Sequence, residues 1–228
     1  TNINFMSFDN KPPQVISFTS SNVGAGKTFN VLNLVATLSF LDKSVIVIDL
    51  DLRKGTLSKR SMVSTTKGVS SYLSNKDVLL KDVIYKSTIN ENVDIIPIGI
   101  IAPNPVELLL GSRLDDLIQE LRGLYDYIVI DSVPIEIIAD AYIIDRVSDL
   151  TIFVVRSGKV DRRQLPDIEA VYKDKKLKNM AVLLNGVSRN AQGYGYGYGY
   201  GYGYGYTYGY EEDKKSGFLN KLTSFFKK

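Results

Sequence analysis

The residues with the clearest chemical potential form a short loop between two apolar segments. The loop matches the pattern G-x-x-x-x-G-K-[ST] at every fixed position except the first, where Ser21 stands in place of glycine. Gly24 and Gly26 allow the backbone to approach a phosphate closely, because neither has a Cβ. Lys27 supplies a positive charge for terminal phosphates, and the Thr28 hydroxyl can ligate Mg²⁺. The loop therefore predicts nucleotide contacts from Val23, Gly24, Ala25, Gly26, Lys27, Thr28 and Phe29. The alternative is a glycine-rich turn between a strand and a helix, with no ligand.

Three aspartates that follow apolar segments are the natural partners of this loop. Asp49 and Asp51 lie two residues apart at the end of one segment, and strand geometry points both to the same side. Asp131 ends another segment, in the place where a Walker B aspartate holds Mg²⁺ directly or through water. Each aspartate considered alone is equally consistent with ordinary turn chemistry. Together with the phosphate loop they predict a magnesium site formed by Thr28, Asp51 and Asp131.

These motifs need a scaffold that brings strand ends together, and the apolar runs predict one. A uniformly apolar, β-branched run such as 45–48 is typical of a parallel strand covered on both faces. Such runs alternate with helical patterns, which indicates an α/β protein with a doubly wound, mostly parallel sheet of the P-loop NTPase type. Ligands of these sheets bind beyond the carboxyl ends of the strands, where the loop and the aspartates fall. The predicted strands are 15–19, 44–49, 93–97, 127–131, 150–155 and 180–184, and the predicted helices are 27–41, 105–122 and 162–175.

The composition excludes several kinds of site and partner. The chain has no cysteine and no histidine, which removes disulfides, thiolate zinc sites and histidine acid–base catalysis. Its net charge of +3 gives no case for nucleic acid as a partner. The sequence has no apolar run of about 18 residues, the length that spans a membrane, and no signal peptide opens the chain. We therefore expect a cytoplasmic protein. Separately, we interpret Asp145, Arg146 and Asp149 as ordinary surface charge.

The composition changes abruptly at Gly193. Seven Gly-Tyr pairs run from there to Tyr206, and nine tyrosines lie within residues 193–210. Glycine at alternate positions disfavours stable local order, so we expect a flexible tail; the alternative is an adhesive segment without chemistry. Residues 211–228 have apolar side chains spaced like one face of a short helix, and a frayed end or docking segment is favoured over a helix on a membrane surface. The predicted organisation is a nucleotide-binding domain at 1–192, followed by the tyrosine tail and this charged amphipathic segment.

The motifs together resemble the bacterial tyrosine kinases, which are the kinase domains of polysaccharide co-polymerases in capsule and exopolysaccharide synthesis. The specific element is D-x-D-x-R at residues 49–53, combined with the tyrosine-rich end of the chain. The phosphate loop and the D-x-x-P that begins at Asp131 are shared with a wider ATPase class. Further matches lie at 68–73 and 99–109, and the resemblance covers residues 13–210.

The resemblance implies an ATP-dependent protein-tyrosine kinase that uses Mg²⁺. Asp49 would orient or deprotonate the incoming tyrosine hydroxyl, while Asp51 and Asp131 would order the metal and its waters. Arg53 belongs to the same element, and Asn185, after the last strand, is placed to read adenine. The implied catalytic set is Lys27, Asp49, Asp51, Arg53 and Asp131, and the implied phosphate acceptors are Tyr194, Tyr196, Tyr198, Tyr200, Tyr202, Tyr204, Tyr206, Tyr208 and Tyr210.

The resemblance also implies partners and a location. Eighteen extended residues span about 60 Å, enough to reach a neighbouring active site, so we expect autophosphorylation in trans within a ring-like homo-oligomer. The arginine-containing helix that mediates ring assembly in the family is not found upstream of the phosphate loop, so weak assembly is expected for this chain. Other expected partners are a cognate protein-tyrosine phosphatase, the polysaccharide polymerase and export machinery, and a membrane-spanning region in the same chain or in a separate activator. The expected location is the cytoplasmic face of the bacterial inner membrane, with this chain itself soluble.

Two other functions stay open. A partitioning or cell-division ATPase of the same fold would hydrolyse ATP to drive dimer cycling. Many such ATPases have a second lysine five positions before the main one, where this chain has Asn22, and they lack a tyrosine tail. A non-catalytic, nucleotide-sensing scaffold is disfavoured because the lysine, threonine and aspartates of the motifs are all intact.

Overall fold

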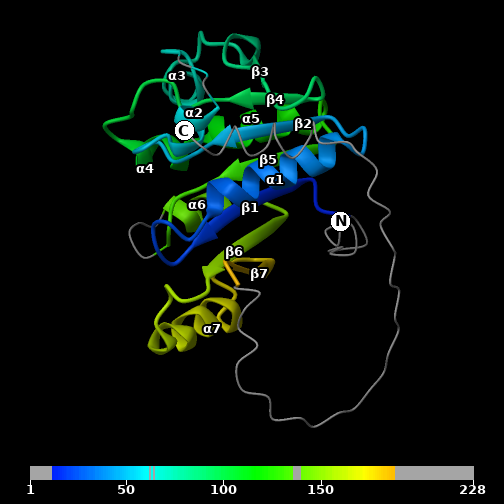
Figure 1. The fold of residues 1–228 in the computed structure, drawn as a ribbon. Coiled ribbons are helices and arrows are strands. Elements are labelled where there is room, and N and C mark those ends of the chain that lie inside the picture. Colours follow the sequence, from blue (N-terminus) through cyan, green and yellow to red (C-terminus); the bar gives the residue numbers. More distant parts are fainter. Residues whose placement is uncertain (1–11, 62, 64, 136–139, 188–228) are drawn as a thin grey trace, which may run out of the picture. The chain divides into compact units, whose positions relative to one another are not determined.

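The computed structural model describes residues 12–61, 63, 65–135 and 140–187. Across this part of the chain the strands form one sheet in the order β3-β4-β2-β5-β1-β6-β7 (Figure 1). All neighbouring strands run parallel except β3 and β4, which are antiparallel. The prediction of a doubly wound, mostly parallel sheet is therefore confirmed. The strands are β1 (Val15–Ser20), β2 (Val45–Asp49), β3 (Tyr85–Lys86), β4 (Val93–Ile96), β5 (Tyr127–Asp131), β6 (Leu150–Arg156) and β7 (Met180–Asn185).

Helices cover both faces of this sheet. The helix α1 packs over β1, β2 and β5 on one face, and Figure 1 shows it crossing in front of these strands. On the other face, α3, α4, α5 and α6 contact one another and share an apolar core with the strands. The helices are α1 (Lys27–Ser39), α2 (Thr56–Arg60), α3 (Val69–Ser74), α4 (Pro105–Leu110), α5 (Ser112–Arg122), α6 (Asp140–Asp145) and α7 (Leu165–Lys173), with short 3₁₀ helices η2 (Leu80–Asp82) and η3 (Arg162–Gln164).

Burial explains why the central strands are apolar throughout. Every residue of β1, β2, β4 and β5 is buried, as expected for parallel strands covered on both faces. Ile46 and Ile48 of β2, for example, join Ile128 and Ile130 of β5 in the core beneath α5. Fully burying each such side chain contributes about 1.5–3 kcal/mol. These strands thus form a rigid platform for the residues at their carboxyl ends.

Two predictions about helices and charges are wrong. The predicted helix 105–122 is divided into α4 and α5, because Gly111 between them has extended backbone angles (φ −62°, ψ 153°). Asp145 and Asp149 are not ordinary surface charge. Asp145 is buried and accepts hydrogen bonds from the Thr151 hydroxyl at 2.6 Å and from the Lys178 backbone at 2.9 Å.

Asp149 ties the start of β1 to the end of α5. Its carboxylate accepts hydrogen bonds from the backbone N–H groups of Gln14 and Val15, at 2.9 and 2.8 Å. It also forms an ion pair with Arg122 at 2.6 Å. These partners hold the pKa of the Asp149 carboxyl below its ordinary value even though burial acts in the opposite direction. Its role is thus to fix the strand that leads into the phosphate loop.

Gly68, just before α3, lies against the backbone at the end of β4. A Cβ at this position would collide with the Pro97 carbonyl and the Gly99 amide. We expect Gly68→Ala to lower the free energy of unfolding by about 1–3 kcal/mol, because the overpacked backbone must shift. Urea denaturation measures this change. Gly123→Ala is the matched control: its Cβ would meet only the Glu120 carbonyl, at 3.6 Å, and we expect no loss of stability there. Equal effects of the two substitutions would contradict this account of Gly68.

The predicted boundary at residue 192, the tail tyrosines and the segment 211–228 all lie outside the described residues. They stay predictions. Within the described ranges, no helix combines the length and the apolar character needed to cross a membrane.

Candidate nucleotide and phosphotransfer site

The phosphate loop connects the end of β1 to the start of α1. Gly24 and Gly26 both have positive φ values, 80° and 100°, which glycine adopts without strain. Gly26 is the N-cap residue of α1 and makes no side-chain cap hydrogen bond to the N–H groups of that helix end. A Cβ on Gly26 would collide with the side-chain amide of Asn185. The loop therefore leaves backbone donors and the positive end of a thirteen-residue helix available to an anion.

Lys27 lies at the first position of α1, close to acidic side chains. Its ammonium donates a hydrogen bond to the Ser20 hydroxyl at 3.1 Å, and Ser20 in turn donates to the Asn22 carbonyl. Burial lowers the pKa of Lys27, while the nearby charges of Asp131 and Asp51 partly oppose that shift. The lysine is thus held in the loop by a hydroxyl, without a direct ion pair to either carboxylate among the described contacts.

Asp131 and Thr28 form the shortest link between two motifs. The Thr28 hydroxyl donates to Oδ2 of Asp131 at 2.6 Å, which aims the lone pairs of the hydroxyl away from the carboxylate. The other oxygen, Oδ1, is buried and has no hydrogen-bond partner among the described residues. Burial, and next the neighbouring charge of Asp49, raises the pKa of Asp131 from 3.8 to about 7. An unpartnered carboxylate oxygen of this kind is suited to a cation or an ordered water.

Asp49 is the neighbour of Asp131 in the sheet. The two residues are paired across β2 and β5, both at the carboxyl ends of their strands. Asp49 is 0% exposed, and its Oδ2 accepts hydrogen bonds from the Ser58 amide at 2.8 Å and hydroxyl at 2.7 Å. Its Oδ1 accepts from the Asp51 amide at 3.2 Å. Burial raises the pKa of Asp49 to about 6, and the bonds from Ser58 oppose that shift.

Asp51 and Arg53 lie in the turn that follows β2. Oδ1 of Asp51 accepts a hydrogen bond from the Lys54 amide at 3.1 Å, so this carboxylate does stabilise a turn. It is half-buried, unlike Asp49, and therefore more accessible to a ligand. Arg53 forms an ion pair with Asp140, at the start of α6, with 3.3 Å between Nη2 and Oδ2. The D-x-D-x-R element thus combines one buried carboxylate, one half-buried carboxylate and an anchored cation.

The phosphate loop is also contacted from β6 and β7. The Asn185 amide donates to the Ala25 carbonyl at 2.9 Å, and its oxygen accepts from the Gly186 amide. Arg156 donates from Nη1 to the Gly24 carbonyl at 2.9 Å. These contacts place Asn185 beside the phosphate loop, and its role in reading adenine stays a prediction.

Sequence reasoning missed four contributors to this site, namely Ser20, Ser58, Asp140 and Arg156. Ser20 and Arg156 stand at strand ends, so strand position is a signal that could have found them. Ser58 contacts Asp49 from another element, and Asp140 contacts Arg53 from 87 residues away, so no local pattern identifies either of them.

A magnesium ion bound with a nucleotide fits this donor set. Among the described residues, no three acidic side chains lie close enough together to hold a metal ion by themselves. A phosphate-loop site does not need such a cluster, because one hydroxyl, one carboxylate and the phosphates supply ligands directly or through water. The Thr28 hydroxyl and the unpartnered Oδ1 of Asp131 match these two protein contributions.

The raised pKa values predict a pH-dependent stability. The folded pKa values of Asp49 and Asp131, about 6 and about 7, exceed 3.8, so the folded state binds protons more tightly than the unfolded chain. This contribution to stability is complete below about pH 4 and is lost as the pH rises through about 6 to 7. We expect Asp131→Asn to gain stability relative to the wild type between about pH 5 and about pH 8, without Mg²⁺ or nucleotide. Urea denaturation at each pH measures the difference, and a pH-independent difference would contradict the assignment.

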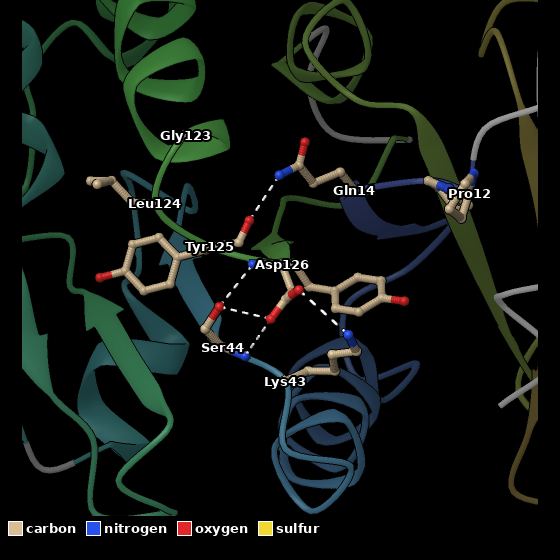
Figure 2. A pocket seen from close by; sticks show the side chains of 10 residues that line it. Pro12, Gln14, Lys43, Ser44, Gly123, Leu124, Tyr125 and Asp126 are labelled. Atoms are coloured by element: carbon tan, nitrogen blue, oxygen red, sulfur yellow. Dashed lines mark hydrogen bonds and ion pairs between the residues drawn. The ribbon is translucent and has the colours of Figure 1, made fainter.

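A cavity at the opposite edge of the sheet is unrelated to this site. Figure 2 shows it lined by Pro12, Ser44 and Tyr125, among others, and its volume is about 570 Å³. These residues precede β1, β2 and β5, at the amino ends of the strands. The polar groups there bind one another: Asp126 accepts hydrogen bonds from the amide and hydroxyl of Ser44 and pairs with Lys43 at 3.5 Å. The candidate catalytic residues therefore lie at the carboxyl ends of the strands and not around this cavity.

The fold and the site define a P-loop nucleotide-binding protein. Residues 13–161 match a family model described as an AAA domain. The tyrosine-protein kinase YwqD of Bacillus subtilis is 33% identical over 186 residues, which cover 82% of this chain and 77% of that protein. The chain belongs to the bacterial tyrosine-protein kinase family, as the resemblance predicted.

Other relatives agree with this assignment. The tyrosine-protein kinase wzc of Salmonella typhimurium is 33% identical over 180 residues, 79% of this chain but 25% of that protein. Among solved structures, the kinase domain of Escherichia coli tyrosine kinase ETK superposes with a TM-score of 0.72 at 29% identity, covering 82% of this chain and 73% of that one. The septum site-determining protein MinD of Pyrococcus horikoshii, complexed with Mg-ADP, gives a TM-score of 0.60 at 28% identity, with coverages of 75% and 68%.

Proposed function

We propose that this kinase transfers the terminal phosphoryl group of ATP to tyrosine hydroxyls, including those of its own tail, and thereby regulates capsule or exopolysaccharide synthesis. The observation that best supports this proposal is the hydrogen bond between Thr28 and Asp131. It joins the phosphate loop to a buried carboxylate, near Lys27, whose second oxygen has no partner among the described residues.

Different residues are proposed to bind the phosphates, the magnesium ion and the adenine of ATP. The phosphate loop binds the phosphates through its backbone amides, and Lys27 offsets the negative charge that the terminal phosphates carry. A magnesium ion bound with ATP would neutralise further phosphate charge, and Thr28, Asp51 and Asp131 are the residues that fit it. Asn185, beside the loop, is the candidate contact for adenine.

Asp49 is the candidate proton acceptor. As the tyrosine oxygen forms its bond to the terminal phosphorus, the bond from that phosphorus to ADP breaks, and the hydroxyl proton passes to the Asp49 carboxylate. A pKa of about 6 suits a group that accepts a proton near neutral pH. Both oxygens of Asp49 accept hydrogen bonds within the chain, but Oδ1 accepts only the 3.2 Å bond from the Asp51 amide and keeps a lone pair for the proton.

Labelled ATP tests the proposed function. The full chain is incubated with Mg²⁺ and ATP that carries a label on the terminal phosphate, and the label is then traced. We expect it on tyrosine, at a rate well above its release as free phosphate. Label that appears only as free phosphate would instead support an ATPase of the MinD class, which this chain resembles in fold. Tight nucleotide binding without turnover would support a nucleotide-sensing scaffold.

Transfer between subunits is a separate prediction. A chain with Lys27→Met retains all tail tyrosines but lacks the lysine, and a chain with its nine tail tyrosines changed to Phe retains the site but lacks acceptors. We expect the mixture to phosphorylate the Lys27→Met tail, because an extended tail of about 60 Å can reach a neighbouring site. Mass spectrometry distinguishes the two chains. Absence of phosphate in the mixture, alongside an active wild type, would show that transfer occurs within one subunit.

The proposed setting follows from the relatives named wzc and from the tail. It comprises a ring-like homo-oligomer, a protein-tyrosine phosphatase, polysaccharide polymerase and export machinery, and a membrane-spanning region in the same chain or in an activator. We place the chain at the cytoplasmic face of the bacterial inner membrane. Because this chain spans 25% of wzc but 77% of YwqD, both arrangements of the membrane region stay open.

A further inference from the structure

The side chain of Arg53 is held in place by the carboxylate of Asp140, which lies on a distant element of the chain. Its Nε and Nη2 atoms both donate to Oδ2 of Asp140, at 3.4 and 3.3 Å. Asp140 stands at the start of α6, 87 residues further along the chain. The two side chains differ sharply in exposure, 39% for Arg53 and 2% for Asp140. The ion pair thus joins the buried carboxylate of Asp140 to the partly exposed guanidinium of Arg53.

The Asp140 carboxylate is costly to bury and is not fully satisfied by this pair. Its Oδ1 atom is buried and has no hydrogen-bond partner among the described residues. Removing a carboxylate from water is unfavourable unless it is paired and hydrogen-bonded. A neutral side chain at this position would avoid that cost but would lose the charge that pairs with Arg53.

The position of the pair relates it to the nucleotide site. The charge of Asp51 acts on Asp140, and the same charge acts on Lys27 and Asp131. Asp140 therefore lies within electrostatic reach of Asp51, one of the residues proposed to support the metal. Arg53 comes two residues after Asp51 and is itself exposed.

Arg53 also has donors that no described residue uses. A guanidinium has five N–H donors, and the contacts to Asp140 use Nε and Nη2 on a single oxygen. No described residue accepts a hydrogen bond from Nη1 of Arg53. A guanidinium that is anchored through some of its N–H groups can bind phosphoryl oxygens with the others.

We propose that Asp140 is a positioning residue for phosphotransfer: it anchors the guanidinium of Arg53 so that the remaining donors of Arg53 bind the phosphoryl group during transfer to tyrosine. This inference rests on the proposed kinase function. Asp140 touches neither substrate, and its entire effect passes through Arg53.

Single and double substitutions test the proposal with the full chain. Asp140→Asn keeps the shape of the side chain and removes its charge. We expect kcat for tyrosine phosphorylation to fall about 10–100-fold, because a misplaced group of this kind costs up to about 100-fold in rate. The KM for ATP and the affinity for Mg-ADP, measured by calorimetry, are expected to change by less than about twofold. Arg53→Gln is expected to lower kcat by a similar or larger factor.

The double variant decides whether Asp140 acts through Arg53. In the Arg53→Gln background, Asp140→Asn is expected to cause no further loss of kcat, because coupled residues are non-additive. Losses that multiply in the double variant would overturn the proposal, as would an unchanged kcat in Arg53→Gln. Arg53 is exposed, so its variant tests the idea even if Asp140→Asn folds poorly; urea midpoints report folding for each chain. Asp115→Asn, which removes an exposed partner of Arg146, is the matched control and is expected to retain wild-type kcat.

Failure of this inference is distinguishable from failure of the proposed function. If the wild type phosphorylates tyrosine and Asp140→Asn matches it, only the role of Asp140 fails. If Asp140→Asn changes nucleotide affinity and leaves kcat intact, Asp140 supports nucleotide binding instead and the proposal is wrong. If the wild type labels no tyrosine, the kinase assignment itself fails.

Discussion

Replacing Lys27 by Met is expected to lower the rate of tyrosine phosphorylation about 10³-fold. The Lys27 ammonium is held within the phosphate loop by the Ser20 hydroxyl at 3.1 Å. Loss of one preorganised donor to developing charge typically costs about 10²–10³ in kcat, and here a full charge is lost as well. Methionine has a similar shape, so the loop should keep its backbone. Initial rates of label transfer from ATP to tyrosine measure the effect.

Lys43→Met is the control for this experiment. Lys43 is exposed, pairs with Asp126, and lines the cavity at the opposite edge of the sheet (Figure 2). Removing its charge changes the net charge of the chain as much as Lys27→Met does, but we expect wild-type phosphorylation. Tyrosine phosphorylation that persists in Lys27→Met would disprove the assignment of this loop as the site of phosphotransfer.

Asp131→Asn is expected to cause the second large loss of tyrosine phosphorylation. Unlike Lys27→Met, this substitution is also expected to change the requirement for Mg²⁺. Asparagine can still accept the hydrogen bond from Thr28, but it brings no negative charge to the buried Oδ1 position. We expect kcat to fall about 10²-fold and the half-saturating Mg²⁺ concentration to rise about 10–100-fold, the range seen when a group supporting a metal is removed. Rates measured across a magnesium titration separate the two effects.

The stability of Asp131→Asn should move in the opposite direction from its activity. The wild-type residue is 2% exposed and is repelled by Asp49, so the amide relieves an unfavourable charge in the metal-free protein. We expect an unfolding midpoint at least equal to that of the wild type at neutral pH. A reduced midpoint together with an unchanged magnesium requirement would mean that Asp131 is structural and does not support the metal.

The motifs at strand ends were predictable because their chemistry is local. The glycines of the phosphate loop adopt the positive φ values that the pattern requires, and Thr28 and Asp131 meet because parallel strands share one carboxyl edge. The central strands were predictable because burial on both faces demands apolar residues throughout. The short strand β3 was missed, since two residues paired antiparallel to β4 leave almost no periodic signal.

Contacts between separate elements of the chain were not predictable from the sequence. Asp149 looks like surface charge in the sequence, yet it binds Arg122 and the first amides of β1. Ser58 was passed over, although its hydroxyl joins Asp49 to the Ile98 amide. In each case the partner lies far away in the chain or on another element, so the role exists only after folding. The predicted helix 105–122 failed for a local reason, because Gly111 adopts an extended conformation between two otherwise helical segments.

Mass spectrometry of the tail tests the central claim most directly. The full chain is incubated with Mg²⁺ and ATP, cleaved, and the peptide that contains residues 193–210 is weighed, beside the same peptide from Lys27→Met. The account predicts phosphate additions on the tyrosines of the wild-type tail and none on the tail of the variant. ADP formation at the same rate in a sample whose tail gains no phosphate, or equal phosphate on both tails, would contradict it.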